Sequence, residues 1–259
     1  MPKTALLPRL LILLSIVLLS ACASTQRNNP PAWDQARQLV LVTTADWDAT
    51  SGTLRRYERS GAAWREVGGP APITVGRSGS AWGVGLHAPQ ANGPIKQEGD
   101  GRAPAGVFRI GTAFGYADRA ATSWPYQGMS ASDWCIDVNA SPLYNRIVDA
   151  RTVGETAVAG STEPMRRDLH AKGDQRYKLG FVIEHNPDNR SGAGSCIFAH
   201  LWKAPGETTA GCTAMAEPMM LELLAWLKPE DHPVFALLPD NELERLAGAW
   251  RLPHPAPHR

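Results

Sequence analysis

Residues 194–215 read GSCIFAHLWKAPGETTAGCTAM, and this stretch sets the expectations for the whole chain. The apolar, aromatic-rich run Cys196–Trp202 predicts a strand that carries His200. A loop follows and ends in a Gly-flanked turn at Cys212. A helix is expected after this turn, because apolar residues recur on one helical face at positions 219, 220, 223, 224 and 227, and Pro218 suits a first helical turn.

Outside this stretch most of the chain favours short strands separated by Gly, Pro and Asn clusters. The expected strands are Gln38–Thr44, Gly52–Arg59, Ala63–Val67, Ile73–Val75, Ala81–Leu86, Val107–Ile110, Trp134–Asp137, Leu179–Glu184 and Val234–Leu238, and the expected helices are Pro218–Leu227 and Asn241–Trp250. Many short strands and few helices predict an all-β or β-rich α+β sandwich. Two longer polar segments, residues 87–106 and 150–178, are expected to wall or cover a site.

The first residues resemble a bacterial lipoprotein signal. Lys3 and Arg9 precede the apolar run Leu10–Leu19, which is too short to span a bilayer comfortably. The run ends in Leu-Ser-Ala-Cys22, which resembles a lipobox whose cysteine is lipidated. We therefore expect a signal peptide over residues 1–21, a lipidated Cys22 with a tether over 22–37, a domain over 38–250 and a disordered tail over 251–259.

This start predicts a periplasmic protein held to a membrane by a lipid on Cys22. Ala23 stands where an inner-membrane retention signal has Asp, so the resemblance implies the outer membrane. Lys and Arg total 26 against 25 acidic residues, and no basic run is present. This balance argues against nucleic acid as a partner.

The remaining cysteines limit the chemistry, because a periplasmic protein can hold disulfides. Three are left after Cys22, an odd number, so at least one thiol stays free or reacts. Cys135 and Cys196 either form a disulfide, which is slightly favoured, or remain two buried thiols. Zinc held by His185, Cys196, His200 and Cys212 is a weaker alternative, because the paired spacing of structural zinc sites is absent.

Cys212 and His200 are the candidate catalytic pair. A thiol in a turn before a helix is expected to have a lowered pKa, since the helix N-terminus and a nearby imidazolium both stabilise thiolate. Backbone N–H groups around Gly211 and Cys212 are candidate donors to an oxyanion. A histidine near such a cysteine is the minimal arrangement of an activated nucleophile.

Three blocks of the chain resemble the L,D-transpeptidase catalytic domain family. His200 followed by Thr209-Ala-Gly-Cys212 is similar to the family's nucleophile signature. Residues 96–108, KQEGDGRAPAGVF, and residues 134–137, WCID, with Tyr144-Asn145 behind them, are similar to two further family segments. The blocks occur in the family's order and cover roughly residues 38–240.

The resemblance implies a fold, a reaction and roles for residues. It implies an L,D-transpeptidase-like β-sandwich in which Cys212 is acylated by a peptidoglycan stem peptide and His200 is the general base. Gly211 allows the turn and Thr209 orients the loop or a backbone donor. Trp202, Tyr144 and Asn145 are expected to bind substrate. No metal or cofactor is implied.

Two departures from the family keep other functions open. Ala210 stands where many members have His, and Ala214 where many have Arg or Asn. The alternatives are a hydrolase of the same family, either an L,D-carboxypeptidase or an amidase that releases wall-linked protein, and a catalytically inactive wall-binding lipoprotein. Asp100 and Arg102 are expected to form an ion pair in a turn, and His87 and His170 to lie on the surface.

Overall fold

The computed structural model describes residues 31–255. The expected signal peptide, Cys22, most of the tether and the last four residues of the expected tail lie outside the described residues. Within residues 31–255 no helix is long and apolar enough to cross a membrane.

The described chain is rich in short strands and has few helices, as expected. The strands are β1 Gln38–Thr44, β2 Ser51–Ser60, β3 Ala63–Thr74, β4 Ser80–Trp82, β5 Ala103–Gly115, β6 Tyr126–Gly128, β7 Asp133–Cys135, β8 Ile147–Asp149, β9 Glu163–Pro164, β10 Leu179–Ile183, β11 Phe198–Leu201, β12 Thr213–Met215 and β13 Val234–Pro239. The helices are α1 Ala150–Val153, α2 Glu155–Val158, α3 Arg167–His170, α4 Glu217–Trp226 and α5 Asp240–Trp250, with 3-10 turns η1 Arg176–Lys178 and η2 Pro229–Asp231.

The main sheet closes on itself. Its strands follow the order β10-β11-β12-β3-β2-β1-β13-β5-β4, and a further pairing joins β10 to β5. The expected sandwich is therefore replaced by a closed mixed sheet, because β5 is long enough to pair with β13 through its first half and with β10 through its second. Closure leaves the strands of the ring without a free edge.

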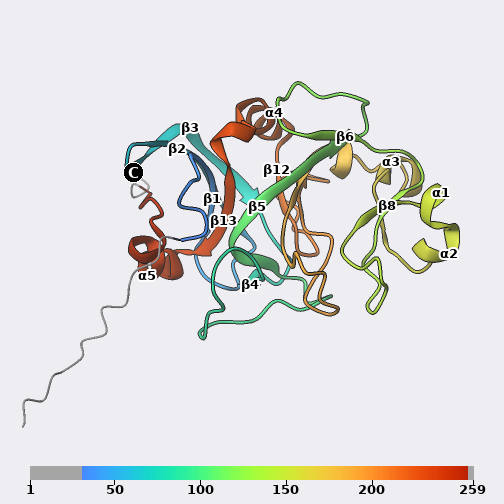
Figure 1. Cartoon of the computed structure of the whole chain (residues 1–259), viewed down its shortest axis with the longest axis horizontal. Coiled ribbons are helices and arrows are strands. Elements are labelled where there is room, and N and C mark those ends of the chain that lie inside the picture. Colours follow the sequence, from blue (N-terminus) through green and yellow to red (C-terminus); the bar gives the residue numbers. More distant parts are fainter. Residues whose placement is uncertain (1–30, 256–259) are drawn as a thin grey trace, which may run out of the picture.

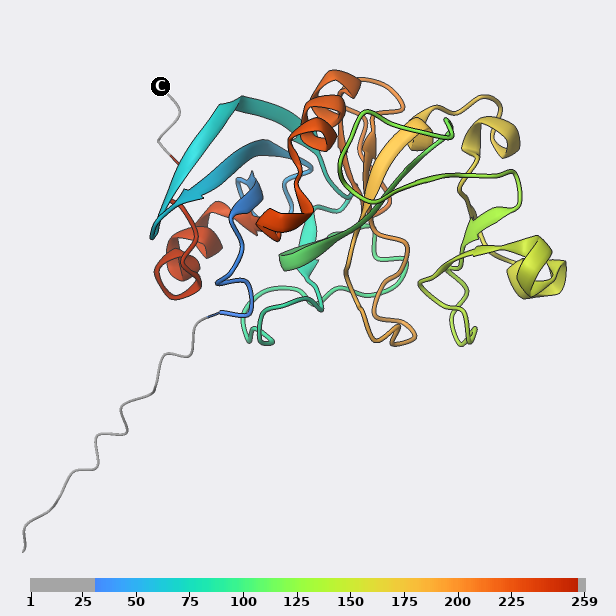
Figure 2. The same ribbon diagram turned by 45° about the horizontal axis from the view of Figure 1, so that its top comes forward.

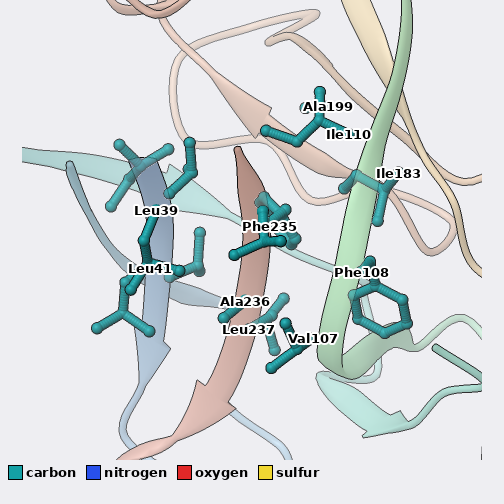
Figure 3. Packing of buried hydrophobic residues seen from close by; sticks show 14 of the residues in the cluster. Leu39, Leu41, Val107, Phe108, Ile110, Ile183, Ala199, Phe235, Ala236 and Leu237 are labelled. Carbon is teal, nitrogen blue, oxygen red and sulfur yellow. The ribbon is translucent and has the colours of Figure 1, made fainter. Parts of the chain in front are cut away.

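The core lies on both faces of this sheet and includes residues of α4 and α5. Every residue of β1 is buried, because β2 and β13 flank it and side chains cover both of its faces. Figure 3 shows the neighbouring strands β1, β13 and β5, whose register places Leu39 and Leu41 on one face of the sheet and Phe235 and Phe108 on the other. Burying one side chain of this size contributes about 1.5–3 kcal/mol, so these central strands form the rigid part of the domain.

A second, three-stranded sheet forms a smaller lobe with the order β8-β7-β9. The helices α1, α2 and α3 lie with it, at the opposite end of the molecule from α5 (Figures 1 and 2). Residues 150–178, expected to be a long polar connection, supply α1, α2, β9, α3 and η1 to this lobe. The segment is folded because β9 pairs with β7, which a reading of local pattern does not detect.

Both expected boundaries of the domain shift outward. Trp33, assigned to the tether, is buried, and its Nε1 donates to the Trp250 carbonyl at 2.9 Å. The two indole rings meet edge to face at 5.4 Å. Leu252, assigned to the tail, is buried as well. Large apolar side chains at both ends thus anchor these flanking residues to the domain.

Candidate functional site

His200 and Cys212 are brought together by two neighbouring parallel strands. In the β11–β12 pair, His200 is the partner of Ala214, and Cys212 immediately precedes β12. Side chains two residues apart share a face of a strand, so Cys212 lies on the same face as Ala214 and His200. The Phe198 N–H donates to Cys212 Sγ at 3.3 Å, which fixes the sulfur against β11.

The surroundings of His200 fix its tautomer. Its Nδ1 lies 2.7 Å from the Leu201 carbonyl oxygen. A carbonyl only accepts, so Nδ1 carries the hydrogen and Nε2 of the neutral ring is left with its lone pair. Burial, helped by the positive charges of Arg176 and Arg167, lowers the pKa of His200 to about 4. At neutral pH the ring is therefore uncharged, with Nε2 able to accept a proton.

Cys212 is a buried thiol. Its Sγ donates to the Cys196 carbonyl at 3.6 Å. Burial raises the pKa of Cys212 to about 12, and the charge of Glu163 acts in the same direction. The expected lowering of this pKa is wrong, because β12 separates Cys212 from α4 and burial outweighs the remaining favourable terms. In the described part of the chain no hydrogen bond joins Cys212 to His200, so the resting pair is a neutral thiol beside a neutral imidazole.

Thr209 organises the turn that carries the thiol. Its hydroxyl donates to the Cys212 carbonyl at 2.7 Å and accepts from the Gly211 N–H at 3.1 Å. The Gly211 N–H is thus used inside the turn and is not the oxyanion donor that the sequence suggested. The N–H of Cys212 is left as the candidate donor. A Cβ at position 211 would lie 3.0 Å from the Arg102 carbonyl oxygen, which explains why glycine fits here.

The Cys135–Cys196 disulfide joins the smaller lobe to the nucleophile. Cys135 ends β7, and its Cα lies 5.9 Å from that of Cys196. Cys196 has a φ of 54° and lies before β11, so the expected extended strand from Cys196 is wrong. The Cys196 N–H donates to Asn145 Oδ1 at 2.9 Å. The disulfide and this hydrogen bond together fix the Cys196 carbonyl, which accepts the hydrogen bond of the Cys212 thiol.

Removing this disulfide is expected to destabilise the domain by about 4 kcal/mol. The bond closes a loop with a sequence separation of 61 residues, and loop-closure entropy for such a length gives that magnitude. The measurement is urea unfolding of the Cys135→Ser/Cys196→Ser variant against the unaltered protein. Equal unfolding midpoints and slopes would contradict the prediction, and Cys212→Ser serves as the control for loss of a thiol.

Cys212 lines a pocket of about 210 Å³ at the junction of the closed sheet and the smaller lobe. The lining residues come from six segments: Arg77; Lys96, Glu98 and Gly99; Asp137; Thr162 and Glu163; Ser195, Cys196 and Ile197; and Ala210, Gly211 and Cys212. A larger and more apolar pocket of about 440 Å³, lined among others by Trp33 and Trp124, contains neither Cys212 nor His200, and buried His200 does not line the smaller pocket either. We assign the chemistry to the smaller pocket because only it contains the thiol.

The three residues expected to bind substrate do not line this pocket. Trp202 donates from Nε1 to Thr74 Oγ1 at 2.8 Å. Tyr144 is buried, donates its hydroxyl to Glu98 and accepts from the Gly194 N–H at 3.1 Å. Asn145 donates to two backbone carbonyls in addition to holding Cys196. Tyr144 and Asn145 therefore support the loop before Cys196 from behind the pocket.

Several lining residues had no role assigned from the sequence. Lys96 and Glu98 lie within the quoted block 96–108, so that motif already pointed to them. Lys96 pairs with Asp100 at 2.5 Å, and Glu98 accepts from Ser195 Oγ at 2.6 Å. Glu163 and Arg77 had no local signal, because they reach the pocket through long-range pairing. Glu163 accepts from the Tyr177 hydroxyl at 2.7 Å, and burial raises the pKa of its carboxyl.

The polar residues for which no catalytic role was expected do not all lie where they were predicted. Asp100 and Arg102 do not pair with each other: Asp100 binds Lys96, and Arg102 binds Asp48 at 2.7 Å. His87 is buried and stacks on Trp250 at 5.2 Å, because the loop that carries it folds back over α5 and β5. His170 is exposed, as expected.

The four candidate zinc ligands do not meet. Cys196 is in the disulfide, and His185 contacts the Val84 N–H and the Ala193 carbonyl. Within residues 31–255 no group of three or more His, Cys, Asp or Glu side chains is arranged to hold a metal ion.

The raised pKa of Cys212 predicts a steep pH dependence of its reaction with iodoacetamide. Only thiolate reacts, so the rate is expected to rise about tenfold per pH unit from pH 7 to 10, without a plateau. The measurement is the rate of mass gain of the intact protein, with Cys212→Ala as the control. A rate already constant above pH 7 would mean that the thiolate is stabilised after all.

The chain matches no protein-family model, and no curated protein matches it. A solved structure that it resembles is that of Bdellovibrio bacteriovorus Bd1075, with a TM-score of 0.37 and 12% sequence identity. The match covers 78% of this chain and 48% of the other, so the chain spans about half the length of that protein. What Cys212 and His200 can do therefore follows from their own surroundings.

Proposed function

We propose that this protein is a cysteine acyltransferase with an L,D-transpeptidase-like domain that acts on peptidoglycan stem peptides. One observation carries the proposal: the three sequence blocks that resemble the family contribute to one pocket. Lys96 and Glu98 come from the first block along the chain, Asp137 from the second, and Gly211 and Cys212 from the third. Residues far apart in sequence thus converge on a thiol beside a histidine.

The surroundings of the pair support acyl transfer. His200 Nε2 takes the proton from Cys212 Sγ as the sulfur attacks the scissile carbonyl, and the Cys212 N–H is positioned as a donor to the oxyanion that forms. The imidazolium returns its proton to the leaving amine when the C–N bond breaks, which leaves a thioester on Cys212. An amine then resolves the thioester to a crosslink. Because both groups are neutral at rest, the charged pair forms only during the reaction.

A hydrolase is the second candidate, and the surroundings of the thiol favour it at two positions. Ala210 is exposed and lines the pocket, and Ala214 is buried in β12 opposite His200. Neither side chain offers a polar group to bind or orient an incoming amine. Water needs no such group, so it can resolve the same thioester and give a carboxypeptidase or an amidase.

The burial of Cys212 is the observation that favours the third candidate, an inactive wall-binding protein. Its side chain is 8% exposed, and its pKa is raised. Against this reading, the exposed part of Cys212 lines the pocket, and His200 is held in the tautomer that a base requires. We therefore rank the acyltransferase above the two alternatives. We also propose that the protein is an outer-membrane lipoprotein anchored through Cys22.

Incubation of the full-length protein with disaccharide-tetrapeptide muropeptides tests the function. The masses of the protein and of the products are followed together, with and without an added amine acceptor. An adduct on Cys212 with crosslinked dimers is the expected result for a transpeptidase, and an adduct with only shortened stems identifies the hydrolase. Absence of both the adduct and the products would refute acyl transfer on this donor.

A further inference from the structure

The side chain of Arg77 is the cation of the pocket for which residues 31–255 provide no ion-pair or hydrogen-bond partner. It lines the same pocket as Cys212, and its side chain is exposed. The other cation of the lining, Lys96, is bound to Asp100 at 2.5 Å and to the Gln97 carbonyl at 2.6 Å. Among residues 31–255 no ion pair or side-chain hydrogen bond of Arg77 is found. Its guanidinium is therefore available to a ligand.

The backbone of Arg77 is tied to the turn of the nucleophile. Its N–H donates to the Thr209 carbonyl at 2.8 Å, and the preceding Gly76 pairs with Thr209 in a parallel bridge. Thr209 in turn is bonded to the Cys212 carbonyl. The position of Arg77 relative to the thiol is thus set by three consecutive backbone and hydroxyl contacts.

The side chain of Arg77 lies across a glycine of the 96–108 block. A Cβ at Gly101 would come within 3.1 Å of Arg77 Cγ and 3.2 Å of Arg77 Cζ, and within 2.9 Å of Ser78 Oγ. Gly101 also has a φ of 71°, which side chains rarely adopt. Because Gly101 has no side chain, the side chain of Arg77 can lie against it. This glycine of the 96–108 block therefore helps to shape the pocket.

Two carboxylates of the smaller lobe, Asp137 and Glu163, also line the pocket. Both are bound to other side chains of that lobe. Neither offers a positive charge to an anionic group, whereas the guanidinium of Arg77 does. A substrate carboxylate in this pocket therefore belongs on the Arg77 side, next to the turn of Thr209 and Gly211.

We infer that Arg77 binds the free terminal carboxylate of the residue that leaves when Cys212 attacks. This inference rests on the proposed function and narrows its substrate class to stems that end in a free carboxylate. In such a stem only one residue follows the scissile amide. A single residue suits a pocket of about 210 Å³ better than a longer peptide segment does. A planar guanidinium binds a carboxylate through two parallel hydrogen bonds.

The test compares a tetrapeptide donor that ends in D-Ala with the same donor ending in D-alanine amide. The unaltered full-length protein is expected to turn over the acid about ten- to a hundredfold faster in kcat/KM, the range for charge-assisted hydrogen bonds. Arg77→Ala is expected to lose this preference through a higher KM for the acid, while the amide reacts as before. Arg77→Lys, which keeps the charge but loses the paired geometry, is expected to restore part of it.

Arg119→Ala is the matched control, because Arg119 is exposed and does not line the pocket. Equal turnover of acid and amide by the unaltered protein would overturn the inference while leaving the proposed function intact. A preference that persists in Arg77→Ala would overturn the assignment to Arg77. Failure to turn over either donor would refute the proposed function itself. Iodoacetamide labelling of Cys212 in each variant reports whether the turn is intact.

Discussion

Replacing Cys212 by Ala is expected to lower the release of the terminal residue at least a thousandfold and to abolish the acyl adduct. In the proposed function the sulfur forms the thioester, and no other free thiol is found within residues 31–255. Removing a nucleophile leaves only the rate enhancement due to binding and oxyanion stabilisation. The measurement is release of D-Ala from a disaccharide-tetrapeptide, with intact mass to detect the adduct.

The variant should remain folded. Cys212 is small, and its loss removes two weak hydrogen bonds of the sulfur, to the Cys196 carbonyl and from the Phe198 N–H, so the free energy of unfolding in urea should change by about 1 kcal/mol. Cys212→Ser is a second variant, in which the weaker hydroxyl nucleophile should give slow turnover. Activity of Cys212→Ala equal to that of the unaltered protein would refute the assignment of Cys212 as the nucleophile, and the acyl-transfer proposal with it.

Replacing His200 by Gln is expected to lower kcat/KM about a hundred- to ten-thousandfold, the contribution of a positioned general base. The amide of Gln can occupy the space beside Leu201 but cannot accept a proton from the thiol. The expected effect is large because a thiol with a pKa of about 12 is almost fully protonated at neutral pH without a base.

The pH profile separates a base from a merely structural histidine. The pKa of His200 is lowered to about 4, so the ring stays neutral and competent above that pH and becomes protonated and inactive below it. The acid limb of kcat/KM should therefore fall near pH 4 in the unaltered protein and be absent from the residual activity of His200→Gln. His87→Gln is the control for losing a buried imidazole outside the pocket. An unchanged acid limb in His200→Gln would rule out His200 as the base.

Local pattern was sufficient for elements whose residues carry their own signal. Gln38–Thr44 forms β1 with the expected bounds, because a continuous apolar run in a β-rich chain suits a strand covered on both faces. The turn after Ser60 and the helix Glu217–Trp226 also agree within one residue of their expected ends. The sequence also singled out Cys212 and His200, which the β11–β12 pair brings near each other, whereas their chemistry stays a prediction.

Local pattern failed where a long-range contact decides the outcome. Residues 150–178 look polar and irregular, yet β9 pairs with β7 and brings Glu163 to the pocket. Trp33 looks like part of a tether until Trp250 packs on it. The lowered pKa expected for Cys212 assumed an adjacent helix, whereas β12 intervenes and the thiol is buried.

The sequence by itself predicted which residues carry chemistry, and it determined that the domain is rich in short strands and that at least one of its cysteines stays free. Only the tertiary structure decided that the sheet closes, that Cys196 pairs with Cys135, and that Arg77 reaches the nucleophile through Thr209. The physical reason is the separation along the chain over which each effect acts. Propensity and periodicity act over neighbouring residues, whereas burial, electrostatics and strand pairing depend on segments that meet only when the chain has folded.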